Sequence, residues 1–516
     1  MPPLPLEPTD DRADPVFRDV ASCNRWLSQL QLTNLQLAHS QLLAQLNEFN
    51  RYPVRAQQRF DTLEALRDTI HHVQNGYARR FIGKPLPLNE NELVALFALA
   101  QLWHELSLGY QRCLQDCMAG DRQPDGKNAL LCQRTLMYIG LTIHEHLAVG
   151  YEFDPGLWHR LHGIYSHAEE QGLLSLEIDD PQTHTRSTCL RIYLTILLSC
   201  HGCPARLNRT QLHLLSGWLP QWTTALAIER RYSASREDAQ PLAFDLSSDQ
   251  GLQPVATVGH GASMRYIAMV PLSKLIRVKT IMLQQDHTPK QVDLGEQASA
   301  SECIELLTLL HRCWCEQPSG KHPGDQQEFF QLCYAFDQTH DLLSGKPVRS
   351  SGSGTPDKPG TDATQGIESW RVDDDSMLAA ELTREAASGI RMGNSRLVAL
   401  RRNETAPYVL GKTARVKVTR DGMLHLYLRF FPGTASAIAL LTEDTEGGSG
   451  SRFSNGFLLH PDNATHIPAS LIVPPSWFRP GLEVSIQVQK GERQLVRLGF
   501  SVERGHDFER VSFTPV

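Results

Sequence analysis

Hydrophobic residues in the first two thirds of the chain recur at every third or fourth position. In "RWLSQLQLTNLQLAHSQLLAQLNEF" (25–49), Trp26, Leu30, Leu37 and Leu46 follow this spacing, which is that of one face of an amphipathic helix. Comparable stretches continue to "SECIELLTLLHRCW" without a repeat of fixed length. The pattern predicts an irregular, repeat-like array of helices over residues 21–345, in which stacked helix pairs leave grooves.

Three segments depart from this pattern. Near residues 240–270, Gly, Pro and Ser separate short apolar pieces, which predicts a small strand-containing insertion. Residues 346–369 combine Ser, Gly, Pro and Asp with almost no large apolar residue, so we expect a flexible linker there. Residues 1–20 carry Pro and Asp without periodicity, and we expect them to form a disordered leader.

After the linker, the hydrophobic period shortens to two. In "LHLYLRF" (424–430) the leucines and Phe430 occupy alternate positions, and His425, Tyr427 and Arg429 occupy the positions between them. About seven or eight such runs, separated by turns, predict an all-β barrel or sandwich over residues 370–516. One face of this sheet should pack, and the other should be solvated or bind a ligand. The chain is therefore expected to be a multidomain protein, all-α first and all-β last.

Composition and charge narrow the classes of function. Of the 516 residues, 41% are hydrophobic and the formal net charge is −7. The part after residue 365 has 18 basic and 17 acidic side chains, which does not favour a general nucleic-acid binder. No apolar run reaches the length of a membrane span, and the start has no basic region followed by an apolar core. Eleven scattered cysteines fit a reducing compartment. We therefore expect a cytoplasmic protein without membrane insertion or a nucleic-acid partner.

Motifs of catalytic and metal sites are incomplete. "GHGASMR" has Arg265 where a nucleophile elbow needs its second Gly, and "HEHLA" has Ala148 where a zinc helix needs its second His. His159 and His162 lie three residues apart, which suits either a metal or, as we prefer, a solvated helix face. The sequence therefore assigns no catalytic residue, no metal site and no cofactor.

The segment "RVDDDSMLA" (371–379) allows two interpretations. Asp374 and Ser376 belong either to a ligand loop or to a turn in which both side chains satisfy backbone N–H groups, and the turn is the preferred interpretation. In a ligand loop, Arg371 and the pair Arg415 and Lys417 would add positive charge. Arg415 and Lys417 should emerge from the same face of one strand.

This part of the chain resembles the PilZ family of small bacterial β-barrels, which bind cyclic di-GMP. Asp374 and Ser376 match the first two positions of the family's Asp/Asn-x-Ser-x-x-Gly motif, and Ala379 replaces the Gly. The family's Arg-x-x-x-Arg pair, which holds guanine edges and phosphates as planar forks, has no counterpart before Asp374. A long helical region joined to such a barrel is similar to an uncharacterised group of bacterial proteins.

Together these features predict a non-enzymatic bacterial regulatory or scaffold protein. Its helical region would bind a protein partner, and a degenerate PilZ-like barrel would be attached to it. The alternative is a cyclic di-GMP sensor that binds its ligand through Arg371, Asp374, Ser376, Arg415 and Lys417. An enzyme whose site is assembled from residues distant in sequence is the second alternative.

Overall fold

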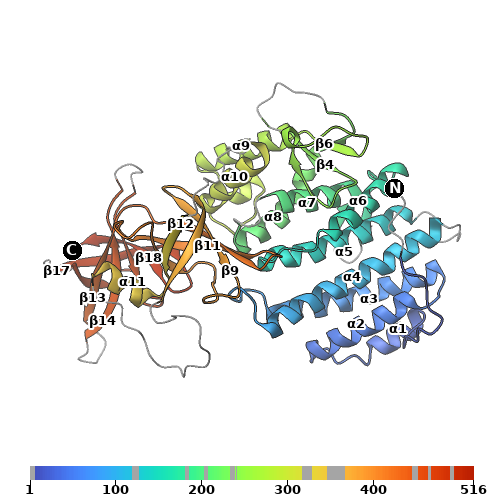
Figure 1. Cartoon of the computed structure of the whole chain (residues 1–516), viewed down its shortest axis with the longest axis horizontal. Coiled ribbons are helices and arrows are strands. Elements are labelled where there is room, and N and C mark those ends of the chain that lie inside the picture. The colour runs from blue at the N-terminus through green and yellow to red at the C-terminus, as the bar shows by residue number, and fades with distance from the viewer. Residues whose placement is uncertain are drawn as a thin grey trace. The chain divides into compact units, whose positions relative to one another are not determined.

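The structure is a computed structural model, and its residues form two compact units. It describes residues 6–118, 127–180, 185–202, 207–232, 239, 241–316, 328–345, 366–443, 451–462, 467–488 and 493–516. The first unit contains Met1–Gly83 and Leu88–Gly320, and the second contains Lys84–Pro87 and Lys321–Val516. Figure 1 colours the chain from blue to red, so that the helices of the first unit are blue to yellow-green and the β unit runs from yellow at α11 (Phe336–Leu343) to red at the C-terminus.

The first unit is an array of α-helices, as the hydrophobic period predicts. Its helices are α1 (Val20–Leu27), α2 (Leu35–Arg51), α3 (Ala56–Tyr77), α4 (Glu90–Met118), α5 (Asn128–Val149), α6 (Gly156–Glu170), α7 (Cys189–His201), α8 (Arg209–Trp222), α9 (Val270–Gln284) and α10 (Ala300–Cys315). Short 3-10 helices are η1 (Ala78–Arg80), η3 (Thr223–Ala225), η4 (Val255–Thr257) and η5 (Pro289–Val292). Consecutive helices pack against one another, with α4 against α3 and α5 and α9 against α10.

Helix α10 illustrates how the sequence encodes these elements. Ser299 caps its start by accepting a hydrogen bond from the backbone N–H of Glu302, whose side chain in turn accepts from the N–H of Ser299. This reciprocal capping satisfies donors that the first turn leaves without helical partners. Leu306, Leu310 and Trp314 follow at a spacing of four and are buried. Local capping and periodicity therefore suffice to predict this helix.

Two small sheets interrupt the helices. Strands β1 (Ile178–Asp180) and β2 (Thr185–Ser187) form a pair between α6 and α7. Strands β3 (Ile228–Glu229), β4 (Leu242–Asp245), β5 (Gln253–Pro254) and β6 (Met264–Ile267) form a sheet in the order β3-β6-β4-β5. The second sheet occupies the position of the expected insertion near 240–270 and begins a little earlier.

A buried ionic network attaches β1 to the helices. Asp180 accepts hydrogen bonds from Arg67 Nη1 and Nη2 at 3.2 and 2.7 Å and from Arg134 Nη1 at 2.8 Å. Both arginines also pair with Glu64, and Arg67 Nε donates to the Tyr138 hydroxyl at 2.9 Å. Burial alone would raise the pKa of Glu64, but Arg134, Tyr110 and Arg67 lower it below its ordinary value. The charges of these side chains are thus compensated within the protein.

The start of the chain is more ordered than the sequence predicts. The leader was expected to extend to residue 20, but Phe17 is buried and its ring lies 5.2 Å from those of Trp26 and Phe49. The backbone N–H of Asp10 also donates to the carbonyl of Arg51. A single aromatic side chain gives no periodic signal, so its anchoring to α1 and α2 cannot be recognised in the sequence.

Within the described ranges, one helix has the length and apolar composition of a membrane span. It is α4, and 61% of its most apolar stretch is buried inside the protein. Nine cysteines at described positions are free, whereas Cys313 is disulfide-bonded.

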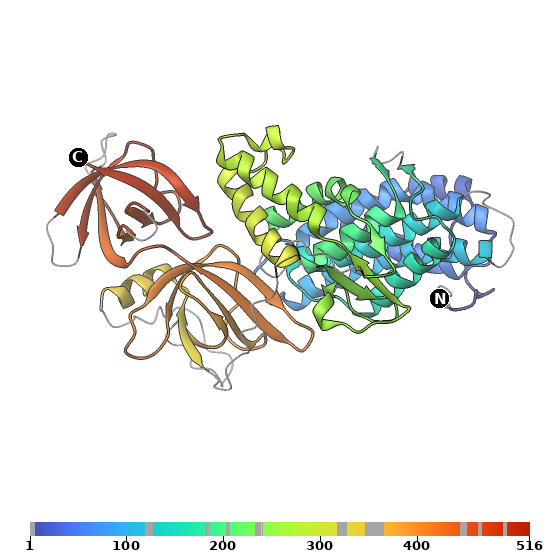
Figure 2. The same cartoon turned by 90° about the horizontal axis from the view of Figure 1, so that it is seen from above.

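The second unit contains two closed barrels, where the sequence predicts one. The first barrel has the strand order β10-β11-β12-β9-β8-β7 and the second β13-β14-β15-β18-β17-β16. The strands of the first are β7 (Phe329–Cys333), β8 (Ile367–Asp375), β9 (Ala379–Glu385), β10 (Leu397–Arg401), β11 (Val409–Val418) and β12 (Met423–Phe430). Those of the second are β13 (Ala435–Glu443), β14 (Ser451–Leu459), β15 (Ser470–Val473), β16 (Glu483–Val488), β17 (Arg493–Arg504) and β18 (Glu509–Pro515). Figure 2 shows the two barrels as separate orange and red sheets.

The two barrels share part of their core. Leu397, Ala399 and Leu410 of the first barrel lie in one buried cluster with Phe457 and Phe508 of the second. Strand β12 shows the alternation expected from the sequence, since its leucines are buried and the residues between them are more exposed. The all-β character of this region is confirmed, although strands such as β8, β9, β14 and β18 were not recognised in the sequence.

The boundary between the units also differs from the expectation. Residues 328–345 were assigned to the helical array, but β7 pairs with β8 and β10 and closes the first barrel. Helix α11 (Phe336–Leu343) packs on strands of both barrels. A five-residue strand and a two-turn helix have no long-range signal in the sequence, because their partners lie far along the chain. A linker was expected at 346–369. Its residues 346–365 lie outside the described part of the chain, and Ile367 is already the first residue of β8.

Candidate functional site

The segment that suggested a ligand loop forms a β-hairpin in the first barrel. Strand β8 ends at Asp375 and β9 begins at Ala379, so residues 376–378 make the turn. The backbone N–H of Ser376 donates to the carbonyl of Ala379 at 2.9 Å, and the N–H of Ala379 donates to Ser376 Oγ at 3.1 Å. Ser376 therefore has the role of a turn residue.

Beside this hairpin, an arginine fork stands over aromatic rings. Arg402 donates to both carboxylate oxygens of Asp375, with Nε–Oδ2 at 2.7 Å and Nη2–Oδ1 at 2.8 Å, and Nη2 also reaches the carbonyl of Ser376. Its guanidinium carbon lies 5.3 Å from the ring centre of Phe430 and 6.0 Å from that of Phe330. The hydrogen bonds to Asp375 raise the pKa of Arg402. The side chain is 31% exposed, so one edge of this fork reaches solvent.

These side chains belong to one end of the barrel, which we call the rim. In an antiparallel barrel, the end of β8 lies beside the starts of β7 and β9 and the ends of β10 and β12. Phe329, Met377 and Leu378 are exposed at the rim, at 56%, 92% and 66%. Arg401 lies 5.1 Å from the ring centre of Tyr408. The rim thus combines exposed apolar surface with two adjacent arginines and a carboxylate.

Apart from Ser376 in the turn, the register places the residues predicted from the sequence on the outer face of the barrel. One row across β8, β9, β12 and β11 is Arg371, Thr383, His425 and Lys417, and the next row is Asp374, Glu381, Tyr427 and Arg415. Residues paired directly across strands share a face, so both rows lie on the same side. Three strand spacings separate β8 from β11, or about 14 Å. Asp374 and Arg415 are therefore on one surface but are too far apart to contact the same small group.

Arg415 does not have the exposure that a ligand-binding arginine needs. Its side chain is 1% exposed, and burial lowers its pKa to about 10. Lys417 is half-buried on the same strand face. The expectation of an exposed basic pair on β11 therefore fails for Arg415. The sequence pattern places both residues on the outer face correctly, but alternation along a strand does not reveal what covers that face.

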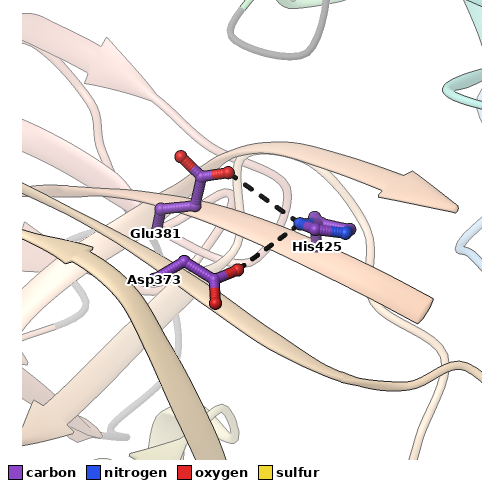
Figure 3. A group of neighbouring side chains, drawn as sticks. All are labelled: Asp373, Glu381 and His425. Atoms are coloured by element: carbon purple, nitrogen blue, oxygen red, sulfur yellow. Dashed lines mark ion pairs between the residues drawn. The ribbon is translucent and has the colours of Figure 1, made fainter. Parts of the chain in front are cut away.

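Two carboxylates and a histidine meet on this outer face, as Figure 3 shows. His425 Nδ1 lies 3.6 Å from Asp373 Oδ2 and 3.8 Å from Glu381 Oε1. The three side chains come from β12, β8 and β9, and their ligand atoms all lie within 4.8 Å of one another. Each side chain is partly exposed, between 19% and 27%. We call this group the Asp-Glu-His cluster.

A β-bulge in β8 brings Asp373 into this cluster. The register with β9 shifts between Val372 and Asp374, so Asp373 has no partner of its own in the ladder. A bulge lets an extra side chain turn toward one face of the sheet. Thr383 Oγ1 donates to Asp373 Oδ2 and lies 3.4 Å from His425 Nδ1. The sequence analysis missed this cluster because strict alternation would send Asp373 and Asp374 to opposite faces.

One of the histidines considered as a metal ligand, His162, lies in the core of the helical unit. His162 is buried, its Nδ1 lies 2.7 Å from the Tyr193 hydroxyl, and its Nε2 lies 2.9 Å from the carbonyl of Gln250. Burial lowers its pKa to about 4. His162 is therefore a core residue, and the expected solvated helix face is wrong for this position.

Comparisons with known proteins identify two regions of the chain. Residues 21–234 match the family model described as "Cyclic-di-GMP receptor FimW, N-terminal domain". Residues 438–516 match the model described as "FimW C-terminal beta-barrel domain". Both matched models describe domains of one kind of receptor. The matched residues of the second barrel are thus similar to a FimW C-terminal β-barrel domain, whereas the sequence analysis named the PilZ family.

A curated relative carries the same name. The "Cyclic-di-GMP receptor FimW" of Pseudomonas aeruginosa is 24% identical over 352 residues, which are 67% of this chain and 56% of that protein. The chain thus spans little more than half the length of this relative. No solved structure matches the chain. The first barrel, with its rim and the Asp-Glu-His cluster, lies between the two matched ranges.

Proposed function

We propose that this chain is a cyclic di-GMP receptor. The observation that carries the proposal is the similarity of both its ends to domains of a protein described as such a receptor. A receptor binds its ligand without converting it, which agrees with the absence of a complete catalytic motif in the sequence. The sensor alternative thus replaces the protein-binding scaffold as the leading function. The bacterial cytoplasm remains the expected location.

The rim of the first barrel is the binding surface that we propose. Guanine presents O6 and N7 as two adjacent acceptors, which an arginine fork can bind together, and the mouths of β-barrels commonly hold small ligands. Arg401 and Arg402 supply two forks, and the exposed ring of Phe329 offers a surface on which a base can stack. Asp374 is exposed at the same end and can accept hydrogen bonds from the amino edge of guanine.

Ligand binding at the rim requires an exchange of partners. Arg402 is held by Asp375, and Arg401 Nε donates to Gln331 Oε1 at 3.0 Å. These contacts hold both forks at the rim before the ligand arrives, which lowers the entropic cost of binding. Arg371 is 41% exposed on the neighbouring strand and can pair with a phosphate.

The test is calorimetric titration of the full-length protein with cyclic di-GMP. Arg401→Gln should weaken binding by about 10–100-fold, because a lost charge-assisted hydrogen bond is worth roughly 1.5–3 kcal/mol. The matched control is Arg420→Gln, since Arg420 is an exposed arginine in the turn between β11 and β12 at the opposite end of the barrel. No measurable binding by the unaltered chain would refute the receptor function. Binding that Arg401→Gln and Arg420→Gln leave equally strong would keep the receptor and refute the rim.

A protein partner for the helical unit is our second proposed function. A groove of about 310 Å³ lies between α9 and α10, lined by apolar side chains such as Ile276, Ile281 and Leu307 and by His311. Ile281 is 51% exposed and Val278 55% exposed on α9. An amphipathic segment of another protein can bury such residues by docking in a groove between helices.

Cross-linking in cells followed by mass spectrometry tests this second function. Ile281→Glu should remove a specific partner, because a charge in an apolar contact is costly. Val94→Glu is the matched control, since Val94 is 60% exposed on α4. A partner profile that is identical for both variants and the unaltered protein would refute docking at this groove.

A further inference from the structure

We propose that the Asp-Glu-His cluster on the outer face of the first barrel binds a divalent transition-metal ion of the zinc class. The sequence assigned no metal site, and the three residues lie outside the ranges that match the two FimW domain models. The inference rests on their geometry and does not depend on cyclic di-GMP binding.

The separation of the ligand atoms is close to that of a metal site. A zinc ion with nitrogen and oxygen ligands at about 2.0–2.2 Å holds these atoms roughly 3.3–3.6 Å apart in tetrahedral geometry. His425 Nδ1 lies 3.6 Å from Asp373 Oδ2 and 3.8 Å from Glu381 Oε1. Since all three atoms lie within 4.8 Å of one another, small rotations of the two carboxylates would bring them into coordination distance.

The backbone holds these donors on rigid, adjacent strands. Register pairs place Glu381 opposite Tyr427 and Thr383 opposite His425, so β9 and β12 fix the positions of Glu381 and His425. The bulge in β8 adds Asp373 to the same face. Bulges that re-aim a side chain are frequent beside functional sites. The hydrogen bond from Thr383 Oγ1 to Asp373 Oδ2 also orients that carboxylate, as second-layer contacts do around metal ligands.

The donor set selects the class of metal. One imidazole nitrogen and two carboxylate oxygens suit zinc and its neighbours among the divalent transition metals, whereas magnesium and calcium prefer oxygen ligands alone. Two carboxylates also neutralise the charge of a divalent ion. Because the cluster is partly exposed, three protein ligands leave the remaining coordination positions open to water or to an anionic group.

Nearby cations set a limit on the affinity. Arg371 Nε lies 3.3 Å from Asp373 Oδ1, and Lys417 is paired with His425 across β11 and β12. Both positive charges oppose a metal ion on the same face.

The experiment is titration of the metal-free, full-length protein with zinc chloride in competition with a chromogenic chelator. His425→Gln and Asp373→Asn should each weaken the tightest site by at least about 10-fold, because loss of even a group that hydrogen-bonds to a metal ligand typically costs about 10–100-fold. The matched control is Asp374→Asn, which removes the same charge from the neighbouring residue outside the cluster and should change affinity less than about threefold. Circular dichroism checks that each variant is folded.

Cobalt(II) supplies an independent readout. Its visible absorption reports coordination by protein ligands, and the spectrum of the unaltered protein should lose intensity in His425→Gln but not in Asp374→Asn. Loss of affinity that is equal in Asp374→Asn and Asp373→Asn would overturn the proposal. So would a tightest zinc site that is unchanged in both His425→Gln and Asp373→Asn.

Discussion

Replacing Asp180 should destabilise the helical unit strongly. In Asp180→Asn the side chain keeps its shape but loses its charge, and two almost fully buried arginines lose the carboxylate that they share. The side chains of Arg67 and Arg134 are 3% and 1% exposed, and Asp180 is 6% exposed. Removing one partner from such a buried network costs about 3–5 kcal/mol. Glu64 still pairs with both arginines, so we expect a loss of about 3 kcal/mol.

Urea unfolding of the full-length protein, followed by its helical circular dichroism signal, measures this loss. With a denaturant dependence of about 3 kcal/mol/M for a unit of this size, the midpoint should fall by about 1 M. Asp179→Asn is the control, because Asp179 is the preceding residue on β1, is 78% exposed and pairs only at the surface with Arg186. Such a pair contributes under about 1 kcal/mol. A midpoint for Asp180→Asn that equals the midpoint for Asp179→Asn would refute the reasoning.

Two further predictions follow from the fold. Burial raises the pKa of Glu145 on α5 to about 7. Between about pH 4 and 7 the folded state therefore keeps a proton on this carboxyl group that the unfolded state has already released, near pH 4.3. The stability that this group contributes thus falls as pH rises from about 4 to 7. Glu145→Gln should therefore raise the unfolding free energy at pH 8, by at most about 4 kcal/mol, and change it little at pH 4. An equal effect at both pH values would contradict this. Limited proteolysis should cut first within residues 346–365, whose composition predicts a linker. Because β7 pairs with β8 and β10, the two fragments should co-elute in gel filtration, and their separation under native conditions would argue against the closed first barrel.

The sequence by itself determined the class of each half of the chain. Hydrophobic spacing and capping residues act within a few positions, so helices such as α10 and the alternation along β12 follow from local patterns. The turn at Ser376 was also among the two interpretations that the sequence allowed, because a serine that bonds its neighbouring backbone is a local feature.

Only the tertiary structure decided how the strands close and which side chains meet. Pairing of β7 with β8 joins residues separated by the expected linker, and no local pattern encodes that contact or the division into two barrels. Likewise, a register shift of one residue turns Asp373 toward Glu381 and His425, and packing buries Arg415, which strand alternation alone would leave exposed. Face and burial depend on cross-strand register and on distant covering segments, and these are properties of the whole fold rather than of any short stretch.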